Sequence, residues 1–332
     1  MYGVSSGSLF HVHDAVMAVI EGTGSASAWR RWVRARTLRQ AEMLAAFLFL
    51  LPNIAGFLVF SFGPVIAAAW ISLLDWNLLN PPQWVGIANY ARLLTDGEFW
   101  SSLRATVVYT LGIVPLSIIP ALILAVLLNQ PIRGRTIYRA IFFLPVVSSL
   151  IAVSLLWRWL YNPSFGLLNY LLNGLFGMLG LSITAPEWLQ SRTWAMPAII
   201  LMSTWKNMGY NMVLYLAGLQ GIPRSLYEAA ELDGAGRWQR FRHITIPLLT
   251  PSTFFVIIIT LIGSFQVFDQ AYIMTAGGPA RSTVTTVYFI YANAFERYQM
   301  GYASAVAWVL FLIIMTFTII QWRYQSRWVF YD

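Results

Sequence analysis

The sequence has no cysteine and only one lysine, and each absence narrows the possible functions. Without cysteine, disulfides and thiolate metal sites are excluded, although the redox compartment stays open. The lysine, Lys206, lies within an apolar segment, so a GxxxxGK[ST] phosphate loop cannot form. Any nucleotide hydrolysis must therefore come from another chain. The histidines, His11, His13 and His243, are too scattered to predict a metal site.

Charge is also scarce. Charged residues make up 10% and apolar residues 58% of the 332 residues, whereas soluble domains are about 25% charged. Long runs without charge predict an all-helical, polytopic membrane protein. The net charge of +8 is compatible with nucleic-acid binding. In a membrane protein, however, such an excess more often comes from arginines in cytoplasmic loops.

The apolar runs predict six transmembrane helices. The first run, residues 43–74, is too long for one straight span and contains Pro52 and Pro64, so we expect a tilted or kinked first helix. A shorter apolar piece, Leu167–Leu181, predicts an interfacial helix on the outer face. The other five spans are expected at residues 105–128, 140–157, 194–219, 252–272 and 301–320.

Arginines indicate the orientation of these spans. Five arginines precede the first span: Arg30, Arg31, Arg34, Arg36 and Arg39. Among the later loops, those on the same side as the two termini carry more arginines than those on the other side. The positive-inside rule therefore predicts that both termini are cytoplasmic. The expected organisation is a partly disordered cytoplasmic segment (1–40), a transmembrane domain (41–323) and a cytoplasmic tail (324–332).

The longest polar interruption is the stretch from Tyr227 to Pro251, which this topology places in the cytoplasm. Good helix formers precede Asp233–Gly236 and a second amphipathic segment follows, so the pattern predicts a helix–turn–helix. Trp238 and Phe241 on this polar surface suggest an anchor that is buried in a partner protein. A simple connector on the membrane surface remains the alternative.

The same stretch resembles the EAA loop of bacterial ABC-importer permeases, the binding-protein-dependent (MetI-like) family. The resemblance implies that this loop is the coupling helix, which docks into a cleft on the ATP-hydrolysing subunit. Gly234 would give the bend between its two short helices. The residues that carry the pattern are Glu228, Ala229, Ala230, Asp233, Gly234, Ala235, Phe241, Ile244, Pro247 and Pro251, and Trp238 is added as an expected ATPase-coupling residue.

Further segments resemble the carbohydrate-importer branch of this family, the relatives of the maltose-transporter permeases. They are Trp84–Tyr90, Gly134–Arg139, Trp157–Pro163, Leu219–Pro223 and Thr275–Pro279. The resemblance implies a permease subunit of the bacterial inner membrane, with no catalytic residue of its own. It further implies a second homologous permease, two ABC ATPase subunits that bind the ATP and Mg, and an extracytoplasmic solute-binding protein.

Polar residues inside the fourth span need an explanation, since a charge at mid-bilayer costs roughly 2.5–3.5 kcal/mol even on lenient scales. Lys206, Asn207 and Asn211 could bond to another span, or Lys206 could snorkel to the interface. Alternatively, they could line a substrate path with Trp205 and Tyr210. Matching to the maltose-type family implies a substrate site made of Ser203, Trp205, Asn207, Tyr210, Thr260 and Ser264, with Gln266 one helical turn away.

Alternatives remain for both the mechanism and the solute. Asp269 near the end of the fifth span, together with Lys206, could serve an ion-coupled secondary transporter, although an interfacial acid bonded to Gln266 or Tyr272 explains Asp269 as well. A structural or signalling membrane protein with a different docking partner is a further possibility. Glycerol 3-phosphate or a polyol could replace a sugar as the solute.

Overall fold

The computed structural model describes residues 38–330, and the chain divides into two units after Ala67. The first unit contains α3 (Leu38–Phe57), the π-helical η1 (Leu58–Phe62) and the start of α4 (Gly63–Ile71). Pro64 has no backbone N–H to donate, and the turn before it is wide, with the Gly63 N–H bonded to the Leu58 carbonyl. The helix therefore continues past both prolines instead of breaking at them.

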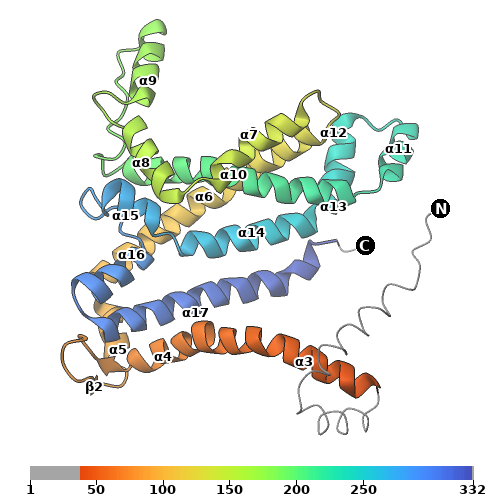
Figure 1. The fold of residues 1–332 in the computed structure, drawn as a ribbon. Helices are drawn as coiled ribbons and strands as arrows, with labels where there is room; N and C mark the ends of the chain where they lie inside the picture. The colour runs from red at the N-terminus through yellow and green to blue at the C-terminus, as the bar shows by residue number, and fades with distance from the viewer. Residues whose placement is uncertain (1–37, 331–332) are drawn as a thin grey trace, which may run out of the picture. The chain divides into compact units, whose positions relative to one another are not determined.

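The second unit begins with the rest of α4, which leads into a two-stranded antiparallel hairpin in which Leu74 is paired with Trp84. Helices then follow one another along the chain (Figure 1). The first half of the unit comprises β1 (Leu74–Asp75), β2 (Gln83–Trp84), α5 (Ala88–Thr95), α6 (Gly97–Asn129), α7 (Arg135–Val147), α8 (Leu150–Leu160), α9 (Leu167–Met178) and α10 (Ala195–Gly221).

The second half of this unit starts with short helices and ends in a long one. Its elements are α11 (Arg224–Leu232), α12 (Arg237–Arg240), η2 (Phe241–Thr245), α13 (Ile246–Leu248), α14 (Thr250–Phe265), α15 (Asp269–Thr275), α16 (Thr286–Tyr291), η3 (Ala292–Glu296), α17 (Met300–Tyr324) and η4 (Gln325–Arg327).

Several of these helices can cross a membrane. In the described part of the chain, three helical stretches are long and apolar enough: Met43–Ile71, Gly97–Asn129 and Met300–Arg327. Two bent pairs raise the number to five if each pair is one span, namely α7 with α8 (98°) and Arg237–Leu248 with α14 (61°). With 27 residues, α10 extends about 40 Å, which is also enough to cross. The helices are thus compatible with six spans.

The helix of the second span, α6, begins at Gly97 instead of residue 105, and two further spans differ from their sequence-based bounds. The third is not one helix but α7 and α8, which are separated by a sharp bend at Ser148 and Ser149. The fifth ends at Phe265 instead of Tyr272, because the Thr285 hydroxyl donates to the Val267 carbonyl at 2.7 Å and stabilises a break before α15. Both differences depend on contacts with residues distant in the sequence, which local periodicity does not contain.

The core lies along α6 and α10. α10 packs on α6 and α7, while α14 packs on α6, α10 and α17. Ala121 and Ala125 of α6 have no exposed surface, so small side chains bring the helix axes close together. Larger side chains such as Met212 and Tyr215 of α10 fill the space beside them. This packing fixes the helices that surround the cavity described below.

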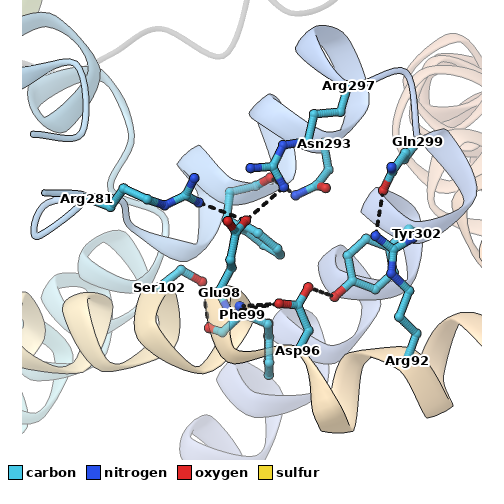
Figure 2. A network of polar contacts seen from close by, with 11 residues as sticks. Arg92, Asp96, Glu98, Phe99, Ser102, Arg281, Asn293, Arg297, Gln299 and Tyr302 are labelled. Atoms are coloured by element: carbon cyan, nitrogen blue, oxygen red, sulfur yellow. Dashed lines mark hydrogen bonds and ion pairs between the residues drawn. The ribbon is translucent and has the colours of Figure 1, made fainter.

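A network of ion pairs joins distant segments at the end of this unit where α6 begins. Figure 2 shows Glu98 between two arginines, and its Oε2 accepts from Arg281 at 3.0 Å and from Arg297 at 2.8 Å. All three side chains are exposed, and exposed pairs contribute about 0.2–1 kcal/mol each. One carboxylate thus connects the start of α6 with the loop after α15 and the turn before α17.

The neighbouring Asp96 caps α6 and binds α17. Its Oδ1 accepts from the Glu98 backbone N–H at 2.8 Å, and its Oδ2 accepts from the Tyr302 hydroxyl. The Arg92 guanidinium lies 4.1 Å from the centre of the Tyr302 ring. Partial burial tends to raise the pKa of Asp96, but the hydrogen bonds from Tyr302 and from the backbone of Glu98 and Phe99 outweigh it, so the pKa is lowered.

Candidate functional site

A cavity of about 340 Å³ lies among α6, α10 and α14, with contributions from the end of α7 and from α15. We call it the α10 cavity. Among the described residues that line it, none carries a formal charge; they offer amides, hydroxyls, tyrosine rings and aliphatic groups. They are Tyr109, Ile113, Val146, Asn207, Tyr210, Asn211, Ile259, Thr260, Gly263, Ser264 and Gln270.

Four of the seven residues that the sequence predicted for a substrate site line this cavity: Asn207, Tyr210, Thr260 and Ser264. The structure therefore brings the expected faces of the fourth and fifth spans together. Asn207 and Tyr210 are also exposed, with Tyr210 45% accessible, so the cavity is open on the side of α10 that they occupy.

The other three predicted residues lie outside the lining. Ser203 is buried behind it and accepts a long hydrogen bond of 3.5 Å from the Gln270 amide. The Trp205 ring packs on Trp157, with 5.6 Å between ring centroids. Gln266 follows the last residue of α14 and is exposed. Ser203 and Trp205 can support the lining but do not form it.

Sequence reasoning missed several lining residues. Asn211 is not one of them, because the sequence left open that it lines a substrate path or bonds to another span. It lines the cavity, and its amide lies 3.4 Å from the Ser117 hydroxyl and 3.5 Å from that of Thr260. Tyr109 and Gln270 gave no signal, because their place in the lining depends on how α6 and α15 pack. The Gln270 amide lies 3.4 Å from the Tyr109 hydroxyl. These long bonds leave the amides able to bond to a ligand.

Lys206 does not line the cavity, although its neighbour Asn207 does. Its amine donates to the carbonyls of Pro145 at 3.0 Å, Val146 at 3.4 Å and Ser148 at 2.8 Å. Of the explanations that the sequence left open for Lys206, the structure shows the hydrogen bond to another span. Asp269 begins α15 and is exposed, and its side chain has no hydrogen-bond partner in the described part of the chain.

The polar stretch forms a helix–turn–helix segment, residues 224–248, as the sequence predicted. α11 ends in a Schellman turn: the Ala235 N–H bonds to the Ala230 carbonyl at 2.8 Å, and the Gly234 N–H bonds to the Glu231 carbonyl at 3.0 Å. Gly234 has a φ of +80°, where glycine carries no Cβ penalty. The bend expected at Gly234 is present.

Contacts between its two arms brace this segment. The Tyr227 hydroxyl lies 2.9 Å from the Thr245 hydroxyl, and Arg240 forms an ion pair with Glu231 at 2.8 Å. The second arm begins with α12 and continues through the π-helical η2 and through Pro247 to Leu248. After a bend of 61°, the second arm continues into α14.

The segment exposes several of the residues predicted to couple to an ATPase. Trp238 is 67% exposed, with its ring 5.5 Å from that of Phe241. Glu228 is exposed and has no partner among the residues that the structure describes. A groove of about 330 Å³ includes Ala230, Asp233, Gly234 and Ala235 in its lining. In Figure 1, α11 and α12 lie at the end of the second unit opposite α15 and α16.

Comparisons with known proteins agree with this arrangement. The family model described as "Binding-protein-dependent transport system inner membrane component" matches residues 113–330. A lactose transport system permease protein, LacF of Rhizobium radiobacter, is 39% identical over 88% of this chain and 97% of its own length. A trehalose/maltose transport system permease protein, MalF of Thermococcus litoralis, is 36% identical over 85% and 94%.

A solved structure shares the fold. A chain of the bacterial alginate ABC transporter, in complex with alginate pentasaccharide-bound periplasmic protein, superposes with a TM-score of 0.75 at 23% identity, over 87% of this chain and 96% of that one. The family match and the LacF and MalF identities confirm the resemblance expected from the EAA-like loop. The chain belongs to the family of binding-protein-dependent transport system inner membrane components, the permease subunits of ABC importers.

Proposed function

We propose that this chain is a permease subunit of an ATP-driven sugar importer and that the α10 cavity is part of its translocation path. The observation that supports this most is the chemistry of the lining. Asn207, Asn211, Thr260 and Ser264 offer uncharged donors and acceptors beside the Tyr210 ring. Sugars present hydroxyls to such amides and C–H faces to aromatic rings.

The relatives favour the same class of solute, since LacF is named for lactose and MalF for trehalose and maltose. A second candidate, glycerol 3-phosphate, would need a cation in the cavity to offset its charge. Among the described lining residues there is none, and the nearby Lys206 amine is bonded to three carbonyls. A neutral sugar or polyol therefore fits the lining better than an anion.

A second permease subunit would complete this path. Asn207 and Tyr210 line the cavity yet remain exposed, so a homologous subunit packed on that side of α10 would close it. We further propose that both termini are cytoplasmic, that an extracytoplasmic solute-binding protein delivers the sugar, and that two ABC ATPase subunits bind ATP and Mg. The chain itself breaks no covalent bond.

The helix–turn–helix segment would connect ATP hydrolysis to this path. Exposed Glu228 and the Trp238–Phe241 pair would dock on an ATPase subunit, with Ala229, Ala230, Asp233, Gly234 and Ala235 forming the turn region beside them. Because the second arm continues into α14, closure of the ATPases would move α14 and with it Thr260 and Ser264 of the cavity. Such rigid-body movement can alternate access between the two sides.

Reconstitution tests this function. The complete transporter is reconstituted in liposomes from the chain, its permease partner, the ATPases and the binding protein. These liposomes should take up radiolabelled lactose or maltose only when ATP is present on the side of the membrane that carries the ATPase subunits. Tyr210→Ala should reduce this uptake, whereas Tyr170→Ala should not, since Tyr170 is exposed on α9 outside the α10 cavity. Uptake by the chain alone under an ion gradient would instead support a secondary transporter.

A further inference from the structure

The break between α7 and α8 exposes backbone groups within a membrane span. The last four carbonyls of any helix have no intrahelical partner, and in lipid each unsatisfied group costs several kcal/mol. At the end of α7 these belong to Leu144, Pro145, Val146 and Val147. The bend of 98° then prevents α8 from continuing the hydrogen-bond ladder.

Side chains satisfy most of these carbonyls. The Ser148 hydroxyl donates to the Leu144 carbonyl at 3.1 Å. The Lys206 amine donates to Pro145 at 3.0 Å, to Val146 at 3.4 Å and to the carbonyl of Ser148 within the bend at 2.8 Å. A cation also interacts favourably with the negative end of the α7 dipole. Each of the three amine protons thus has an acceptor at the break.

The backbone of α10 approaches α7 closely one turn further along. A Cβ on Gly209 would lie 2.0 Å from the Phe142 carbonyl oxygen, so only glycine fits there. Lys206 and Gly209 therefore hold α7 at two neighbouring points. Val146, whose carbonyl accepts from Lys206, lines the α10 cavity together with Asn207.

We propose that Lys206 is a positioning residue that fixes the broken span α7–α8 against α10 and so sets the Val146 wall of the α10 cavity. Its effect on transport rests on the proposed function. Its charge is used by carbonyl oxygens of the chain and does not bind the solute. If an anionic solute drew the amine away, the carbonyls of Pro145, Val146 and Ser148 would lose their partner, at a cost in stability.

Distance measurement by electron paramagnetic resonance tests the contact without any solute. Because the chain has no cysteine, spin labels at Val147→Cys and Val213→Cys report specifically on α7 and α10 when the chain is labelled before assembly with its partner subunits. Lys206→Met keeps the length of the side chain but removes the donors, and should broaden the distance distribution. Lys206→Arg, which keeps charge and donors, should restore a single narrow distance, and Gln220→Met on α10 should leave it unchanged.

A distribution in Lys206→Met as narrow as in the wild type would overturn the proposal. If Lys206→Met does not assemble, Lys206→Gln retains two donors and should give an intermediate width; a width equal to the wild type would again count against it. Lys206→Arg that remains as broad as Lys206→Met would also refute the role of the donated hydrogen bonds.

ATP-dependent lactose and glycerol 3-phosphate uptake distinguishes positioning from anion binding. In Lys206→Met the apparent KM for lactose should rise about tenfold, or roughly 1.4 kcal/mol, with little change in maximal rate, because the Val146 wall of the cavity is no longer held in place for binding. A loss confined to glycerol 3-phosphate would instead assign Lys206 to the solute. A fall in maximal rate alone would indicate a general structural defect and refute positioning. If the wild type takes up neither probe, the proposed solutes are wrong. The distance measurement would still decide whether Lys206 holds α7 against α10.

Discussion

Gly209→Ala tests the contact between α10 and α7 most directly. The new Cβ would lie 2.0 Å from the Phe142 carbonyl oxygen and 2.9 Å from its carbonyl carbon. An unstrained C···O contact needs about 3.3 Å, so the two helices must separate locally by about 1 Å. The obstacle is backbone, which cannot rotate away as a side chain can.

The free energy change has two opposing parts. Overpacking costs about 1–3 kcal/mol, and a backbone obstacle favours the upper end. Alanine gains about 1 kcal/mol of helix propensity over glycine. We therefore expect Gly209→Ala to lower the free energy of unfolding by about 2 kcal/mol.

Titration of the purified chain from mild detergent into SDS, followed by circular dichroism, measures this change. Gly221→Ala is the matched control, because a Cβ there meets no atom within 4 Å and the residue lies in the same helix. The control should be neutral or slightly stabilising. Equal stability of Gly209→Ala and the control would refute the close approach of α7, and with it the geometry assigned to Lys206.

Three further predictions concern other parts of the molecule. Tyr302→Phe removes the hydrogen bond to Asp96 and should lower the free energy of unfolding by about 1 kcal/mol, a value already reduced for screening by solvent. The pKa of Asp96 is lowered from 3.8. The difference in the free energy of unfolding between wild type and Tyr302→Phe should therefore be complete above this value, and it should be lost as the pH falls through the folded-state pKa. Glu228→Arg, or Gly234→Pro at a φ of +80° that proline cannot adopt, should abolish solute-stimulated ATPase activity but not membrane insertion; unchanged stimulation would contradict docking. Trp205→Ala should reduce uptake less than Tyr210→Ala, and the opposite order would place the solute near Trp205.

The sequence predicted elements whose signals are local. Charge-free runs predicted apolar helices, several of which are long enough to cross a membrane, and Gly234 between two helical patterns predicted the turn. The resemblance of the EAA-like loop led to the family, which the comparisons confirm. For the substrate site, matching placed Asn207, Tyr210, Thr260 and Ser264, and the structure brings these four into one cavity.

What the sequence could not supply depends on tertiary packing. The partners of Lys206 lie about 60 residues away, across a bend that no periodic pattern marks. Glu98 gathers two arginines that follow it by nearly 200 residues, although in the sequence they are ordinary loop charges. Gln270 lines the cavity because α14 breaks before α15, and that break relies on Thr285. Each of these contacts forms only after the helices have packed.

The bracing of the helix–turn–helix segment has a mechanical consequence. An unsupported loop would bend under a load and dissipate it before the load reached the membrane. Here three contacts connect the two arms: the Tyr227–Thr245 contact, the Glu231–Arg240 ion pair and the Schellman turn. These contacts hold the two arms together as one unit. The Leu249 N–H bonds to the Thr245 carbonyl at 3.0 Å and the Thr250 hydroxyl donates to the Pro247 carbonyl at 2.6 Å, so the support continues across the bend of 61° into α14. If the segment docks on an ATPase subunit as proposed, a force applied at Trp238 would therefore reach α14 through a continuously hydrogen-bonded arm.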